Sequence, residues 1–475
     1  MAENLLKFVD TQQHYPEVTE AEIRKKAYSE IYGNFSDVDA TEQASRCSQC
    51  GVPFCQIHCP LQNNIPDWLK LTAEGRYKEA YEISSATNTF PEICGRICPQ
   101  DRLCEGNCVI EKGFGSVTIG SVEKFLTETA FTNGWVTPFS PSYENGLSIG
   151  IIGAGPAGLA AAEWLRKKGY KIEVYDRYDR IGGLMIYGIP NFKLDKKIVE
   201  RRKEQYEKSG IHFHLNTEIG KQITFEGLRK KHDAVLIATG VYKAKEIEIP
   251  DASLANILPA LDYLTASNRH TLGDKVKAFE DGTLNAKDKH VVVIGGGDTA
   301  MDCVRTAVRQ GAKKVTCLYR RDQANMPGSQ REVKNAIEEG VEFLWLSAPK
   351  AFVGKKQVEM ILCHKMKLSS PDGSGRQSVS PLENSQFSLK TDMVLKSLGF
   401  DPEDVPTMFG AKDLTLNSNG TIKVNPKTME TSIPNVFAAG DIVRGASLVV
   451  WAIRDGRDAA EAVHERLRMQ TKKAA

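Results

Sequence analysis

The sequence has neither a long apolar run nor a surplus of charge of one sign. Its 475 residues include 62 Lys and Arg against 60 Asp and Glu. Such a balance provides no broad positive field for a phosphate backbone or an anionic membrane, so nucleic acid is excluded as a predicted partner. The longest apolar stretches, such as 234–238 and 291–294, fall far short of the ~20 residues that span a bilayer. We therefore expect no membrane partner either.

The first residues, M-A-E-N-L-L-K-F-V-D, also lack the sustained apolar segment of a secretory signal. A cytoplasmic location is expected on this basis. Clustered cysteines in a reducing compartment are more often metal ligands or redox groups than disulfides. The point matters here because eight of the eleven cysteines lie in two short runs.

The length predicts about three domains, since a domain usually takes roughly 100–200 residues. Residues 1–145 carry the cysteine runs among helix-like patterns and are expected to form a small helical module. The pattern then changes to short apolar strands, glycine-rich turns and amphipathic helices, which is typical of α/β units with parallel strands. We expect two such Rossmann-like units, one at 146–280 and 405–475 and the other at 281–404.

A glycine motif marks the first unit. In L-S-I-G-I-I-G-A-G-P-A-G, Gly153, Gly155 and Gly158 follow a strand and open a helix. Glycine permits the tight turn and the close backbone approach that place a pyrophosphate on a helix N-terminus. Asp176 ends the next strand, at the distance expected of a carboxylate that binds a ribose hydroxyl. The four residues predict a dinucleotide site.

The second unit has a similar motif but a different strand end. Arg320 and Arg321 stand where the first unit has its acid. A guanidinium can pair with a 2′-phosphate, whereas a carboxylate would repel it, so this unit is predicted to prefer NADPH over NADH. The predicted cofactor-binding residues of this unit are Gly295, Gly297, Asp298, Thr299, Ala300, Arg320 and Arg321.

The cysteine spacings are C-x2-C-x4-C-x3-C-P from Cys47 and C-x3-C-P-x4-C-x3-C from Cys94. Thiolates packed this densely suit iron–sulfur clusters. Zinc and disulfides remain open as alternatives, although zinc usually takes paired C-x2-C knuckles and only Cys47 and Cys50 form one. A zinc-folded docking module is therefore the competing hypothesis from a different functional class.

Two further segments resemble flavoprotein reductases with two dinucleotide domains. They are D-R-I-G-G-L-M-I-Y-G-I-P-N-F-K-L from Asp179 and N-V-F-A-A-G-D-I-V-R-G from Asn435. The resemblance implies that the first site holds FAD and that the NADP domain is inserted in the FAD domain. By this likeness the predicted FAD site also includes Gly182, Gly183, Leu184, Lys193 and Asp441.

Thioredoxin reductases would need a C-x-x-C dithiol in the NADP domain. Cys303, Cys317 and Cys363 instead stand alone. We expect no catalytic thiol and a hydride transfer directly from NADPH to the flavin.

The motifs C-G-R-I-C-P-Q-D-R-L-C-E-G and G-G-G-D-T-A-M-D-C, with the order of the units, resemble the small (β) subunits of bacterial NADPH-dependent glutamate synthases. The same module forms the N-terminal part of dihydropyrimidine dehydrogenase. The resemblance implies two [4Fe-4S] clusters, Cys94 not being a ligand. Their implied ligands are Cys47, Cys50, Cys55 and Cys108 for one cluster, and Cys59, Cys98, Cys104 and Glu123 for the other.

The resemblance also implies a function. NADPH would reduce FAD, and electrons would pass through the clusters to a large (α) subunit that makes glutamate from glutamine and 2-oxoglutarate. Ala2 follows Met1, so the chain has no cysteine placed to become an N-terminal amidotransferase nucleophile. The alternative is the same type of reductase serving another acceptor, such as ferredoxin or a sulfur compound.

Overall fold

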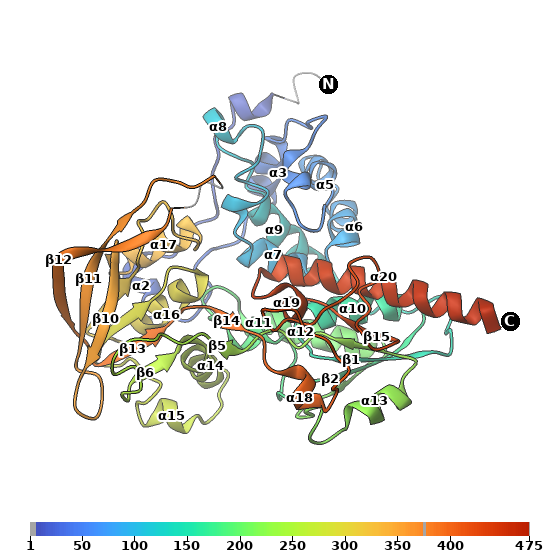
Figure 1. Ribbon diagram of the computed structural model, residues 1–475. Helices are drawn as coiled ribbons and strands as arrows, with labels where there is room; N and C mark the ends of the chain where they lie inside the picture. Colours follow the sequence, from blue (N-terminus) through green and yellow to red (C-terminus); the bar gives the residue numbers. More distant parts are fainter. Residues whose placement is uncertain (1–5, 374–376, 475) are drawn as a thin grey trace.

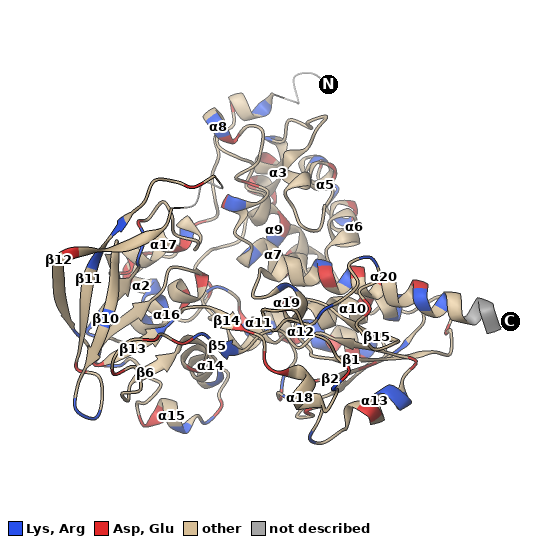
Figure 2. Ribbon diagram, in the orientation of Figure 1, with Lys and Arg blue, Asp and Glu red and all other residues tan. Residues whose placement is uncertain are grey.

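The computed structural model describes residues 6–373 and 377–474 and contains three units (Figure 1). A helical unit that carries the cysteine runs lies above two units built on parallel sheets. No helix in the described ranges combines the length and apolarity needed to cross a membrane. Lysines and arginines are interspersed with acids over all three units (Figure 2), in agreement with the near-zero net charge.

The helical unit packs around Trp68, whose side chain is fully buried and donates to the Asn63 side chain over 3.0 Å. Its longest helix, α9, crosses α7 where Gly95 meets the backbone of Gly120. The elements are η1 (Lys7–Val9), α2 (Ala21–Arg24), α3 (Asp37–Ser45), α4 (Phe54–Ile57), α5 (Ile65–Ala73), α6 (Tyr77–Thr87), α7 (Pro91–Ile97), η2 (Gln100–Arg102), α8 (Glu111–Phe114) and α9 (Ile119–Thr132).

The first sheet unit has five parallel strands in the order β15-β4-β1-β2-β3. Helix α10 packs along the C-terminal helix α20. The strands are β1 (Ser148–Ile152), β2 (Lys171–Tyr175), β3 (Ile211–His214), β4 (Ala234–Ile237) and β15 (Val436–Ala438). The helices are α10 (Pro156–Lys167), α11 (Leu184–Tyr187), α12 (Lys196–Lys208), α13 (Phe225–Lys231), α18 (Val405–Phe409), α19 (Asp441–Arg444) and α20 (Val449–Ala474).

The second sheet unit repeats this plan in the order β6-β13-β7-β8-β9 and adds the antiparallel sheet β10-β11-β12. Its parallel strands are β6 (Ile257–Pro259), β7 (His290–Ile294), β8 (Lys314–Leu318), β9 (Glu342–Leu344) and β13 (Met393–Lys396). The others are β10 (Ser347–Val353), β11 (Met360–Leu368) and β12 (Val379–Lys390). Its helices are α14 (Ala260–Thr271), α15 (Lys277–Glu280), α16 (Asp298–Arg309) and α17 (Gln330–Glu338).

The chain passes between the sheet units twice, and the two passages pair with each other. Strand β5 (Lys243–Ala244) on the way out is antiparallel to β14 (Phe400–Asp401) on the way back. The predicted fold class, with one α/β unit inserted in the other, is confirmed. The predicted limit at residue 281 stays a prediction, and β6, which precedes that limit, is hydrogen-bonded into the second sheet.

Candidate functional site

The first glycine turn joins β1 to α10 and leaves no room for larger residues at two places. Gly153 has φ +109°, and a Cβ there would lie 2.3 Å from the Ala238 carbonyl oxygen. A Cβ on Gly158 would lie 2.0 Å from the Gly153 oxygen. Gly155, by contrast, faces open space, since a Cβ there would meet no described atom within 4 Å. This cradle fits a pyrophosphate above the start of α10.

Asp176 follows β2 and is held beside this turn. Its carboxylate accepts hydrogen bonds from the backbone N–H of Ala154 at 2.7 Å and of Tyr178 at 2.8 Å. Burial raises its pKa, although the two N–H donors oppose that shift. A carboxylate has about four acceptor positions, so lone pairs remain for a ribose hydroxyl.

Gly182 and Gly183 lie against the first turn, as the FAD prediction requires. Both have positive φ, +109° and +54°, and the Gly182 N–H donates to the Ala154 oxygen over 2.7 Å. A Cβ on Gly183 would lie 3.0 Å from the Gly155 Cα. The next residue, Leu184, begins α11 and lines a cavity in front of both turns.

The second glycine turn joins β7 to α16 in the same manner. Gly295 has φ +147°, and a Cβ there would lie 2.3 Å from the Ser397 oxygen. Gly297 faces open space among the described residues. Asp298 opens α16 and accepts from the Ser329 N–H at 2.9 Å, and the next residues of the helix are Thr299 and the fully buried Ala300.

Arg320 and Arg321 follow β8 in this unit. Arg320 is exposed to solvent. The Nε atom of Arg321 is buried and has no hydrogen-bond partner among the residues that the structure describes. A guanidinium nitrogen left without an acceptor is suited to an added anion, so the residues present fit the predicted 2′-phosphate contact.

One cavity of about 230 Å³, partly open to solvent, adjoins all three units. Gly153 and Gly155 line it from the first glycine turn, Thr299 from the second, and Ile97 and Pro99 from the cysteine module. The sequence did not indicate Ile97 and Pro99, although both flank Cys98. The cavity therefore brings together the two predicted dinucleotide sites and the chain beside a predicted cluster ligand.

Lys193 reaches across this cavity to the second sheet unit. Its ammonium lies 2.8 Å from the carboxylate of Asp302, four residues after Asp298 on α16. Burial raises the pKa of Asp302 to about 6, against the opposing effect of Lys193. Sequence reasoning missed Asp302, and the spacing of four residues on one helix was the signal that could have found it.

Asp441 and Thr239 line the same cavity from the first sheet unit. Burial raises the pKa of Asp441 to about 7. The Thr239 hydroxyl is buried and has no hydrogen-bond partner within the described ranges. Both groups are thus available to a bound polar molecule, which fits FAD in the first site.

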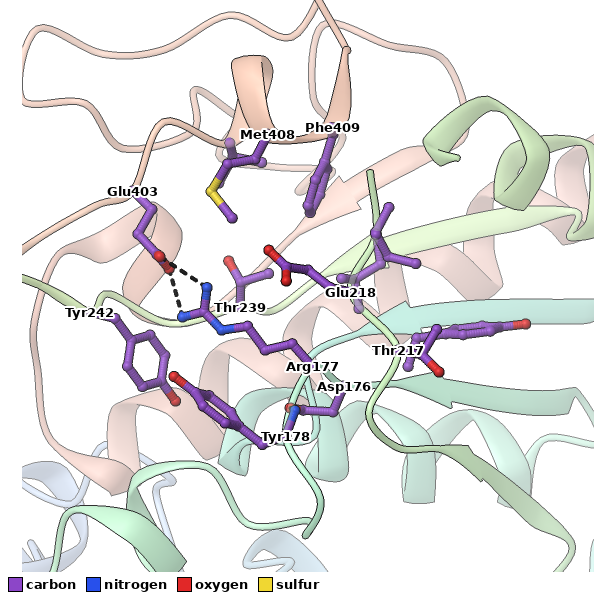
Figure 3. Close-up of a pocket in the computed structure, with 15 residues that line it drawn as sticks. Asp176, Arg177, Tyr178, Thr217, Glu218, Thr239, Tyr242, Glu403, Met408 and Phe409 are labelled. Atoms are coloured by element: carbon purple, nitrogen blue, oxygen red, sulfur yellow. Dashed lines mark hydrogen bonds and ion pairs between the residues drawn. The ribbon is translucent and has the colours of Figure 1, made fainter. Parts of the chain in front are cut away.

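A second hollow adjoins Asp176 (Figure 3). In it Arg177 forms a two-pronged ion pair with Glu403 at 2.9 and 2.8 Å, and its guanidinium lies 5.1 and 5.0 Å from the ring centres of Tyr178 and Tyr242. No sequence pattern indicates this group, because Arg177 and Glu403 are 226 positions apart.

Four cysteines gather near the surface of the helical unit. Burial, followed by the charges of Cys47 and Cys108, raises the pKa of Cys55 to about 12. The charge of Cys50 acts on the same thiol, and the side chains of all four residues are partly exposed. They are the predicted ligands of the first cluster.

The remaining predicted ligands lie deeper in the unit. Burial raises the pKa of Glu123 to about 8, and its carboxylate accepts from the Asn88 side chain at 3.0 Å. The charge of Glu123 in turn raises the pKa values of Cys59, Cys98 and Cys104, after burial and other effects.

Cys94 also belongs to this neighbourhood. Its thiol is buried and donates to the Asn88 amide oxygen over 3.6 Å. Cys94 also forms a side-chain hydrogen bond with Cys98, so both Glu123 and Cys94 lie beside the second group of cysteines. The choice between them as the fourth ligand stays a prediction.

Across residues 6–373 and 377–474, no three His, Cys, Asp or Glu side chains converge closely enough to hold a single metal ion. A four-iron cluster is larger than one ion and separates its ligands more widely. Outside the helical unit, Cys303, Cys317 and Cys363 are fully buried, and burial raises the pKa of Cys317 to about 12. Buried thiols of this kind are poor nucleophiles.

Two family models match the chain. One, described as dihydropyrimidine dehydrogenase domain II, 4Fe-4S cluster, covers residues 24–135. The other, described as pyridine nucleotide-disulphide oxidoreductase, covers residues 147–456. The fold of the sheet units is similar to that of FprA from Mycobacterium tuberculosis in complex with NADPH, with a TM-score of 0.59 at 20% identity over 69% of this chain and 86% of FprA.

Curated relatives match nearly end to end. The chain is 61% identical over 463 residues to the glutamate synthase (NADPH) small chain of Azospirillum brasilense, covering 97% of this chain and 96% of that protein. It is 43% identical over 468 residues to the corresponding small chain of Escherichia coli K12, covering 98% and 99%. The chain therefore belongs to the family of glutamate synthase (NADPH) small chains, which confirms the resemblance inferred from the motifs.

Proposed function

We propose that this chain is the electron-input subunit of a glutamate synthase, an NADPH-dependent oxidoreductase that passes electrons to a large subunit making glutamate from glutamine and 2-oxoglutarate. The observation that carries the proposal is the cavity shared by the two glycine turns and the cysteine module. The 61% identity to a glutamate synthase small chain supports this acceptor over ferredoxin or a sulfur compound.

The residues that would hold the cofactors are those assembled around the cavity and in the helical unit. The first glycine turn would hold FAD, with Asp176 binding a ribose hydroxyl and Asp441 the ribityl and phosphate region, and the second turn would hold NADPH with Arg320 and Arg321. Two [4Fe-4S] clusters would take the two cysteine groups. The chemistry that FAD supplies when bound is the conversion of two-electron hydride transfer into the single-electron steps that iron–sulfur clusters accept.

The protein's own part is binding and orientation. The cavity brings the two dinucleotide sites together, and the Lys193–Asp302 pair holds the second sheet unit against the first at 2.8 Å. The location that fits this function is the reducing cytoplasm, where clustered cysteines serve as metal ligands more often than as disulfides.

The test uses the purified chain with bound flavin and iron, kept free of oxygen. NADPH should bleach the flavin absorbance, and dithionite should bleach further absorbance that belongs to iron. A chain that contains zinc in place of iron would contradict the cluster assignment. Co-expression with the large chain should give a complex that forms glutamate from glutamine and 2-oxoglutarate. Reduction of flavin without such a complex would favour another acceptor.

A further inference from the structure

The loop between Cys98 and Cys104 contacts the second sheet unit at the start of α17. The Asp101 carboxylate accepts from the backbone N–H of Gln330 at 3.2 Å and from the Ser329 hydroxyl at 3.4 Å. Ser329 is the N-cap residue of α17, yet its side chain makes no capping bond to that helix. Asp101 therefore satisfies, from another unit, one of the N–H groups at the start of α17 that have no partner within the helix.

The neighbours of Asp101 contact the same unit. Arg102 donates to the Pro327 carbonyl oxygen and lies 3.7 Å from the Asp298 carboxylate. On the other side, Arg331 donates to the Gln100 side chain over 3.1 Å. Three consecutive residues of η2 thus bind the second sheet unit.

The loop itself is tightly held. The Gln100 side chain donates to the Cys94 oxygen at 3.1 Å, and its backbone oxygen accepts from the N–H groups of Glu105 and Gly106 at 2.9 and 3.0 Å. A Cβ on Gly106 would lie 1.9 Å from the Asp101 oxygen. Such a loop fixes the position of what it binds instead of adapting to it.

The segment that it binds forms part of the second dinucleotide site. Residues 320–330 begin with the two arginines after β8 and end at the start of α17. Between these ends, the Gly328 N–H donates to the Gly296 oxygen at 3.0 Å, and Ser329 donates to Asp298 at 2.9 Å. The segment thus links the predicted 2′-phosphate contact to the glycine turn.

We propose that Asp101 and Arg102 are positioning residues for NADPH, so that the cysteine module completes the wall of the second dinucleotide site by holding residues 320–330. The inference rests on the proposed function, in which this unit binds NADPH. Linkage requires that a nucleotide bound to this site stabilise the loop in return. No bond is made or broken by the two side chains.

The test compares Asp101→Asn and Arg102→Gln with the wild type, each carrying flavin and iron. The Kd for NADP+ should rise about threefold to tenfold, while the limiting rate of flavin reduction at saturating NADPH stays within about twofold. Asp101→Glu, which keeps the carboxylate, should restore part of the affinity. Arg76→Gln, which removes an exposed ion pair with Glu79 inside the module, is the matched control and should leave the Kd unchanged.

Amide hydrogen exchange gives a second measurement. NADP+ should protect the amides of residues 98–104 in the wild type and protect them less in Asp101→Asn. If iron is lost from Asp101→Asn, Ser329→Ala and Arg102→Gln decide between the outcomes, since Ser329→Ala removes the hydroxyl that donates to Asp101 and leaves the module unchanged. An unchanged Kd in Asp101→Asn and Arg102→Gln, or a lower limiting rate at unchanged Kd, overturns the inference. A wild type that does not bind NADP+ overturns the proposed function instead.

Discussion

Arg320 and Arg321 follow β8 at the place where the first sheet unit has Asp176, and the difference should decide nucleotide choice. We expect Arg320→Ala to weaken the binding of NADPH by about 1.5 kcal/mol. This is the lower end of the range for a charge-assisted hydrogen bond, because Arg320 is exposed. NADH, which lacks the 2′-phosphate, should be little affected. The measurement is kcat/KM for both nucleotides with ferricyanide as acceptor. Lys313→Ala, another exposed cation of this unit, is the control, and equal losses for both nucleotides would contradict the assignment.

Glu123 and Cys94 both lie beside the second group of cysteines, and two substitutions separate their roles. Cys94→Ala should retain both clusters. Glu123→Ala should change the electron paramagnetic resonance signal or the iron content of one cluster, because it removes the predicted carboxylate ligand. Loss of a cluster from Cys94→Ala, together with a wild-type spectrum for Glu123→Ala, would reverse the assignment.

Asp441 should make the FAD-free protein less stable to unfolding as the pH rises. Burial raises its pKa to about 7 in the folded chain, whereas the unfolded chain releases this proton near its ordinary value of 3.8. At pH values between these two pKa values, unfolding releases the proton of Asp441. The contribution of Asp441 to the free energy of unfolding therefore falls as the pH rises. Asp441→Asn should therefore raise the Tm more at pH 8 than at pH 4 in calorimetry. The same increase at both values would show that the charge is not responsible.

At the scale of elements, the crossing of α7 and α9 depends on one glycine. A Cβ on Gly95 would lie 2.8 Å from both the Gly120 oxygen and the Lys124 nitrogen, which are backbone atoms that cannot rotate away. We expect Gly95→Ala to cost about 1–3 kcal/mol by overpacking and to lower the iron content. Thermal unfolding and iron analysis provide the test. Gly51→Ala, whose Cβ would meet no described atom within 4 Å, should behave as the wild type.

Structural elements that depend on residues close together in the chain could be predicted from the sequence. The turn at Gly153 follows from a strand, a glycine spacing and a helix that are adjacent in the chain, and the same reasoning found the turn at Gly295. The Arg177–Glu403 pair could not be found in this manner, because chain folding alone brings those residues together. The contact between Asp101 and the start of α17 could not be predicted for the same reason.

At the scale of the whole molecule, a buried ion pair joins the helical unit to the second sheet unit. Arg24 lies 2.9 Å from Glu339 and 2.7 Å from Glu338, and its side chain is 3% exposed. Breaking a buried pair usually costs 3–5 kcal/mol, but Glu339 also pairs with Arg305 and Arg309, so we expect Arg24→Ala to cost about 1–3 kcal/mol.

In calorimetry of Arg24→Ala, the helical unit should unfold in a separate transition at a lower temperature than the rest of the chain. Lys25→Ala provides the control, since it removes the neighbouring, more exposed pair with Glu22. A single transition at the wild-type temperature in Arg24→Ala would mean that the ion pair does not couple the two units.

The pairing of β5 with β14 has a consequence for how the sheet units can move. Two chain passages that are hydrogen-bonded to each other resist stretching and shear, whereas the pair can still twist or bend as one ribbon. A rotation of the second sheet unit about this ribbon is therefore less restrained by the chain than a separation of the two sheet units, and it would also break the Lys193–Asp302 pair. Such a rotation would carry the unit away from Asp101 and from Arg24 together. We therefore expect the contacts of Asp101 and of Arg24 with the second sheet unit to form and break together.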